Sequence, residues 1–132
     1  MLFLNRLVLK ITMEATIDAK VKAVEGQLGI TLEGVRKLRA ECSESWTTAE
    51  FAKQHVMQVT KPLPNTKRNW VFLEDGKYCD KFKYFISHTW GASAAMLLEA
   101  IIVHGERVGG NPAYYLDIVS EDQHVLNQVS AI

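Results

Sequence analysis

The chain has few cysteines, few prolines and no excess of charge of either sign. It contains two cysteines and three prolines in 132 residues, and its 15 basic side chains equal its 15 acidic side chains in number. A net charge of zero gives no electrostatic reason to expect binding to nucleic acid or to an anionic membrane. Cys42 and Cys79 form neither a CxxC pair nor zinc-like spacing. They predict two reduced thiols in a cytoplasmic protein.

Long hydrophobic runs are also missing. Residues 1–11 are largely apolar, but Asn5, Arg6 and Lys10 interrupt them, and no small-residue cleavage site follows. The segment therefore predicts an amphipathic strand or helix rather than a signal peptide or a membrane-spanning helix. No Walker loop, GxGxxG or HExxH motif occurs. At 48% hydrophobic residues, the composition is that of a folded protein with one continuous core.

Helical periodicity marks the N-terminal part of the chain. Between residues 14 and 28 apolar side chains recur at helical spacing, and Gly29 then offers a C-terminal stop. Thr31 begins a second helix candidate with a narrow apolar stripe. Its basic side chains are expected to form a solvated face. They are Arg36, Lys37 and Arg39.

A capping box predicts the start of a third helix. The Thr47 side chain can accept from the backbone of Glu50, and the Glu50 side chain can reach back to Thr47. The prolines at positions 62 and 64 end this helix, because each disfavours helix in the residue before it. We predict that residues 1–66 form a mainly helical segment with its boundary at this Pro-rich stretch.

The remaining residues, 67–132, predict an α/β fold. Residues 82–87 and 113–119 read as apolar strands, and residues 92–108 between them have the apolar face of a helix that covers a sheet. This order is that of a βαβ unit of a parallel sheet. Residues 70–73 form a short apolar run that fits either a strand or a helical turn.

Polar residues gather where the two predicted strands end. Ligands of open α/β sheets lie outside the carboxyl ends of the strands, and parallel neighbours end on the same side. We therefore expect one polar depression at this edge of the sheet. Its candidate ligand-binding residues are Ser87, His88, Thr89, Trp90, Asp117, Gln123 and His124.

The individual residues at the first strand end allow more than one role. Ser87 and His88 are adjacent in a strand and point to opposite faces, which disfavours a nucleophile–base pair. Ser87 or Thr89 is expected to cap the next helix or to bind a ligand through its hydroxyl, and the helix N-terminus could receive a phosphate. Trp90 is expected to pack the helix against the sheet, with stacking on a nucleotide base as the alternative.

A metal site is the alternative reading of the histidines. His88, Asp117 and His124 would be a reasonable ligand set for zinc, and a metal-dependent hydrolase could use them. Their spacing matches no known metal signature, so a hydrogen-bonded structural network is favoured. We assign neither a catalytic residue nor a metal ligand.

Several segments together resemble a known family. Residues 84–90 (YFISHTW), 115–118 (YLDI) and 122–124 (DQH) are similar to the strand ends of a TIR-like (Toll/interleukin-1-receptor-like) group found in large proteins of algae and other protists. Residues 46–50 (WTTAE) and 59–62 (VTKP) resemble the segment that precedes the motif in that group. The resemblance implies a partial flavodoxin/TIR-like parallel sheet behind an N-terminal helical segment.

The chain departs from the family pattern in two places. Glu121 and Asp122 stand where the pattern more often has an asparagine before Gln123. The chain also ends at Ile132, whereas TIR domains continue for several strands and helices, and their NAD-cleaving members carry the catalytic glutamate there. No residue of this chain, Glu121 included, inherits that role.

The resemblance implies a function in signalling. We expect a TIR-like interaction module, non-catalytic as an isolated chain, that binds a protein partner or another copy of itself. The alternative is part of an NAD-cleaving enzyme that a further segment or a partner completes. NAD or another nucleotide is the cofactor that this alternative would imply.

Overall fold

Within the described residues, four strands form one mixed sheet. The computed structural model describes residues 28–65, 67–121 and 123–124. The strand order is β2-β1-β4-β3, in which β3 and β4 are parallel and β1 is antiparallel to both of its neighbours. The strands are β1 (Leu28–Thr31), β2 (Cys79–Lys81), β3 (Tyr84–Ile86) and β4 (Ala113–Leu116).

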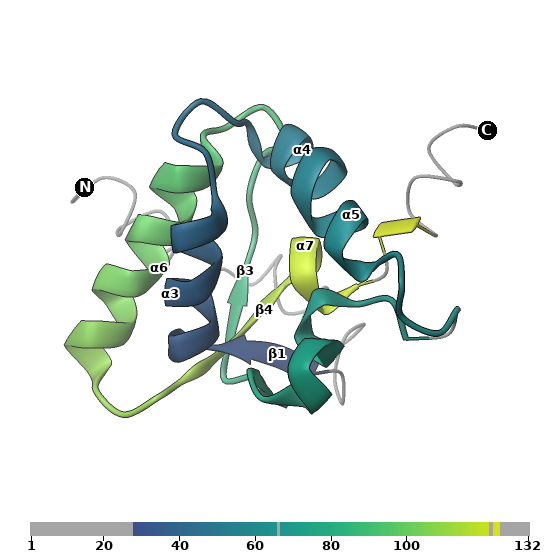
Figure 1. Cartoon of the computed structure of the whole chain (residues 1–132). Helices are drawn as coiled ribbons and strands as arrows, with labels where there is room; N and C mark the ends of the chain where they lie inside the picture. Colours follow the sequence, from purple (N-terminus) through teal and green to yellow (C-terminus); the bar gives the residue numbers. More distant parts are fainter. Residues whose placement is uncertain (1–27, 66, 122, 125–132) are drawn as a thin grey trace.

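Helices pack around this sheet in two groups (Figure 1). The longest two, α3 (Leu32–Glu41) and α6 (Ala94–Val108), lie side by side. The second group begins with α4 (Thr48–Phe51), which continues through the π-helix η1 (Ala52–Val56) into α5 (Met57–Thr60). The group also includes α7 (Asp117–Ser120) and the 3-10 segment η2 (Trp70–Gly76). The run at 70–73 thus begins as a helical turn, and its last residue, Leu73, has an extended backbone.

The βαβ unit predicted from the sequence is present as β3, α6 and β4. The register pairs Tyr84 with Tyr114 and Ile86 with Leu116 in parallel. The second strand is shorter than predicted: β4 ends at Leu116, and Asp117 begins the short helix α7. Within the described sheet β3 is also an edge strand rather than a central one.

The strand β1 was not predicted, and it makes the sheet mixed. Gly29, predicted to stop a helix, lies inside β1 between β2 and β4. A Cβ atom at Gly29 would lie 2.4 Å from the carbonyl oxygen of Tyr114, so only glycine permits this close approach of two backbones. Among the described strands, only β3 and β4 are therefore parallel to each other.

The two-part division of the chain stays a prediction. Both sides of the Pro-rich stretch contribute strands to the described sheet and side chains to one core. The helix predicted between residues 14 and 27 and the strand or helix predicted over residues 1–11 lie outside the described residues. Among the described residues, no helix has the length and apolarity needed to cross a bilayer.

Side-chain caps start the helices where the sequence places them. Thr47 and Glu50 form the predicted capping box, and Thr31 caps α3 by accepting from the Gly34 amide. Ser93 caps α6 by accepting from the Met96 amide at 3.2 Å. The expectation that Ser87 or Thr89 caps α6 is therefore wrong, because the loop after β3 is longer than a direct strand-to-helix turn.

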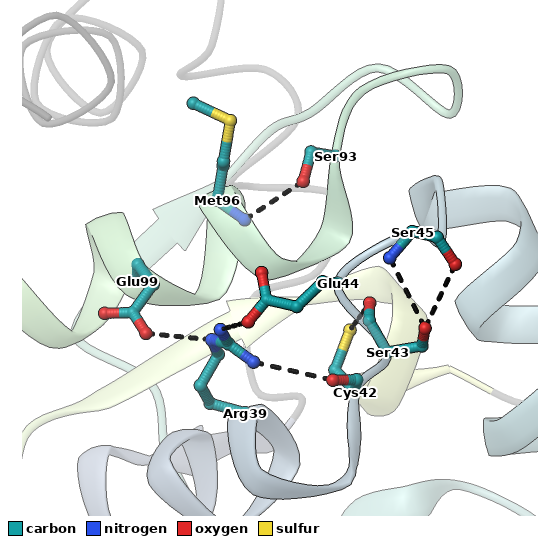
Figure 2. A network of polar contacts seen from close by, with 8 residues as sticks. All are labelled: Arg39, Cys42, Ser43, Glu44, Ser45, Ser93, Met96 and Glu99. Atoms are coloured by element: carbon teal, nitrogen blue, oxygen red, sulfur yellow. Dashed lines mark hydrogen bonds and ion pairs between the residues drawn. The ribbon is translucent and has the colours of Figure 1, made fainter.

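An ionic network joins α3 to α6 (Figure 2). Arg39 donates from Nε to Oε1 of Glu99 at 2.8 Å and also pairs with Glu44. Its Nη1 donates to the carbonyl oxygen of Cys42 at 3.4 Å. The predicted solvated face is thus only partly solvated, because Arg39 is used to connect the two long helices.

The sheet is covered on both faces by aromatic side chains. Tyr114 stacks on Tyr84 on one face, and Tyr115 stacks on Phe85 on the other. The two tyrosines lie on opposite faces of the sheet, and both are at most 2% exposed. Burial raises the pKa of both phenols. Tyr114 shares a hydrogen bond of 2.8 Å with Nδ1 of the buried His104.

Ile86 at the end of β3 provides a test of the strand's placement. Its side chain is 2% exposed, so we expect Ile86→Asp to lower the free energy of unfolding by roughly 4 kcal/mol or more, because the carboxylate is buried without a partner. The control is Met96→Asp, since Met96 is 50% exposed and should change stability by about 0.5 kcal/mol or less. Denaturant titration of both variants measures the difference, and equal effects would place Ile86 at the surface.

His104 should make the protein less stable in mild acid. Burial, and then the charge of Arg107, lower the pKa of His104 from its usual 6.5. The unfolded chain therefore takes up a proton at this residue before the folded chain does, and stability falls as pH drops below about 6.5 and through the folded pKa. We expect His104→Asn to remove this part of the pH dependence in thermal unfolding. An unchanged pH profile would contradict it.

Candidate functional site

The carboxyl ends of β3 and β4 bring two sequence-predicted residues into contact. The pairing of Ile86 with Leu116 aligns the two strand ends. His88 follows β3 by two residues, and Asp117 directly follows β4. Nε2 of His88 and Oδ1 of Asp117 are 2.6 Å apart. Because a carboxylate oxygen accepts, His88 donates from Nε2. This hydrogen bond joins the loop after β3 to the first residue of α7.

The imidazole of this pair is enclosed. The His88 side chain is 3% exposed and the Asp117 side chain 32%. The second ring nitrogen, Nδ1, lies 3.4 Å from the carbonyl oxygen of Thr89. Trp90 meets the His88 ring edge-on with 4.7 Å between ring centroids, and it is itself 40% exposed. Trp90 thus packs on the His88 ring, and its expected contact between the helix and the sheet stays a prediction.

Further hydrogen bonds fix the backbone around Asp117. Gln123 donates from Nε2 to the carbonyl oxygen of Asp117 at 2.7 Å. The Ser120 hydroxyl accepts from the amide of Leu116 at 3.2 Å, and the Ser120 carbonyl accepts from Nδ2 of Asn69 at 2.7 Å. The end of β4 is thus tied to the residue that precedes η2. Asn69 could not be predicted as part of this site, because its bond to Ser120 joins segments 51 residues apart in sequence.

The remaining candidate residues have different surroundings. Ser87 is half-buried, and its side chain has no hydrogen-bond partner among the described residues. Thr89 is exposed, and its carbonyl oxygen accepts from the Thr48 hydroxyl at 2.8 Å, which attaches the loop to the start of α4. His124 bonds through Nε2 to the Thr60 hydroxyl at 3.1 Å. His88 is thus hydrogen-bonded to Asp117, and His124 is hydrogen-bonded to a residue of α5.

The arrangement fits a hydrogen-bonded network. Across the described ranges, no group of three histidine, cysteine or acidic side chains is arranged to hold a metal ion. His88 is enclosed and hydrogen-bonded through Nε2, so a substrate would have to displace either Trp90 or Asp117 to reach it. The geometry supports positioning of the loop and of Trp90 more than proton transfer to a bound molecule.

Sequence analysis also missed a polar cluster elsewhere. His55 in η1 and Glu41 at the end of α3 are 2.7 Å apart, between Nε2 and Oε1. The His55 ring also stacks on Phe51. Only the spacing of Lys37 and Glu41, four residues apart in one helix, was a local signal for this cluster.

Comparisons with known proteins add no identification. No protein-family model matches the sequence. Searches of curated proteins and of solved structures find no match either. Functional inference therefore depends on the geometry described above and on the resemblance of the strand-end motifs.

The pair between His88 and Asp117 can be tested by a double-mutant cycle. We expect the two alanine substitutions to be coupled by roughly 1–3 kcal/mol in the free energy of unfolding, because the loss of Asp117 leaves the enclosed His88 ring without its partner. The control pair is Arg36 and Glu106, whose side chains are both more than half exposed and whose Nη2 and Oε2 atoms lie 3.7 Å apart. For this pair we expect coupling of about 0.5 kcal/mol or less. Additive effects at His88 and Asp117 would show that their hydrogen bond contributes no stability.

Proposed function

We propose that this chain is a TIR-like interaction and signalling module of the cytoplasm, with no catalytic residue of its own. Its binding surface is the loop after β3, centred on Trp90, and its partner is another folded protein or a second copy of the chain. The observation that carries the proposal is that Trp90 is 40% exposed while it rests on the enclosed His88 ring.

An exposed tryptophan on a fixed support has the properties of an interface anchor. Tryptophan contributes a large apolar area with few rotatable bonds, and it is enriched among residues that dominate binding energy. The backbone beneath it is fixed as well, since the Trp90 carbonyl accepts from the amide of Ala49 at 3.0 Å. A second large exposed side chain, Met96, follows in the first turn of α6 at 50% exposure. The loop is therefore preorganised, which lowers the entropic cost of binding.

The same geometry disfavours enzymatic use of the strand ends. The hydrogen bonds of His88 and Asp117 are made within the protein. The alternative is that the chain is part of an NAD-cleaving enzyme that a further segment or a partner completes. Release of nicotinamide by the purified chain, removed by substitution of one carboxylate, would favour the alternative over the interaction module.

A site-specific photocrosslinker tests the proposed surface. We expect benzoylphenylalanine in place of Trp90 to form a defined protein adduct in the native cell, or a covalent dimer of the purified chain. The control position is Val108, which is 44% exposed in the last turn of α6. Mass analysis of the adducts provides the measurement. Equal adduct formation at both positions, or none at position 90, would contradict the proposed surface.

A further inference from the structure

A concave site lies between α3, the helical stretch η1–α5, and η2. The cavity has a volume of about 460 Å³. It shares no lining residue with the surface around Trp90. We refer to it as the α3–η2 cleft. Its lining residues are Lys37, Glu41, His55, Val59, Leu73 and Glu74.

One wall of the cleft is a chain of charged and polar groups. Glu41 uses one carboxylate oxygen for Nε2 of His55 at 2.7 Å and the other for Nζ of Lys37 at 3.0 Å. The hydrogen bond to Glu41 is the main cause of the raised pKa of Lys37, so this lysine is an ammonium ion. Each carboxylate oxygen of Glu41 thus has a partner within the protein, and Glu41 holds the other two side chains in place.

Glu74 on the opposite wall is less completely paired. Its Oε2 lies 3.6 Å from Nζ of Lys37, and the side chain is half exposed. Glu74 and Asp75 both have positive φ angles, 52° and 58°, a left-handed conformation that is uncommon for residues other than glycine. The chain thus keeps a strained backbone at the position that directs Glu74 toward the cleft.

The charge of the cleft favours a cationic ligand. The lining contains one lysine and two glutamates, so its net charge is −1 when His55 is neutral. Val59 and Leu73 add apolar wall that suits an aliphatic stem. An anion would meet two carboxylates, whereas a cation would meet one ammonium that already has a partner.

We propose that the α3–η2 cleft binds an alkyl cation, a guanidinium or primary ammonium on an aliphatic stem. The cationic group pairs with Glu74, for which a guanidinium offers two parallel hydrogen bonds. The stem lies along Val59 and Leu73. Such a group occurs on small amines and on arginine or lysine side chains of a protein partner, and the same cleft chemistry recognises both.

The test is an NMR titration of the intact chain with butylguanidinium and, separately, with acetyl-arginine-amide, at mildly alkaline pH. We expect saturable shifts of the backbone amides of Lys37, Val59 and Glu74 with at least one probe. Binding of the small cation alone indicates a free amine or guanidine as the ligand. Binding of the blocked arginine indicates a side chain of a protein partner.

Three variants decide whether binding occurs as proposed. Glu74→Gln should weaken binding about tenfold, because a charge-assisted hydrogen bond is lost. Lys37→Met should strengthen binding, because it removes the competing ammonium ion. Glu106→Gln, at a salt bridge with Arg36 outside the cleft lining, should leave binding unchanged.

Thermal unfolding of each variant separates loss of binding from loss of folding. Lack of a saturable shift with either probe, or weaker binding by a folded Lys37→Met variant, would overturn the proposal. Neither result would affect the proposed role of Trp90, because the two sites share no residue.

Discussion

The hydrogen bond between His88 and Asp117 is the constraint on which the candidate site depends. It joins the ends of two parallel strands that belong to segments 29 residues apart in sequence. An enclosed imidazole needs a partner for its polar nitrogen, since a buried polar group without a hydrogen bond is costly. Asp117 provides that partner from the position where β4 has ended at Leu116 and α7 begins. The position of Trp90 follows from the position of His88.

Close approach of backbones determines the rest of the sheet. β1 can lie between β2 and β4 because Gly29 has no side chain to meet the carbonyl of Tyr114. Where the long helices meet, a Cβ atom at Gly105 of α6 would lie 2.5 Å from the end of the Leu32 side chain of α3, so a larger residue there would displace this leucine. The ion pair of Arg39 with Glu99 then joins the same two helices at their surface. The glycine where the two helices meet and the ion pair at their surface together fix α6 over the sheet.

Local signals in the sequence were sufficient for some elements and insufficient for others. The capping box of Thr47 and Glu50 and the parallel pair of β3 and β4 were predictable, because caps act over three residues and apolar runs mark strands. The strand at Leu28–Thr31 was not predictable, since Gly29 is equally a helix stop and a site of close backbone approach.

The candidate site was predictable in its location and only partly in its contacts. Two strand ends at one edge of a sheet predicted the contact of His88 with Asp117. His124 is hydrogen-bonded to Thr60 at the end of α5. This contact depends on how the helices pack, and the positions of the strand ends do not predict it. The cluster of Glu41, His55 and Glu74 likewise arises from three elements that meet only after folding, so its spacing in the sequence has no regular pattern.

The most direct test of this account is the state of the His88 imidazole in the folded protein. Nitrogen-edited NMR of the histidine rings should show a proton on Nε2 of His88 that exchanges slowly with water, because the ring is enclosed and donates to Asp117. The signal should move or broaden when Asp117 is replaced by asparagine. A His88 ring that exchanges as fast as an exposed histidine, or that is unaffected by Asp117→Asn, would contradict the account.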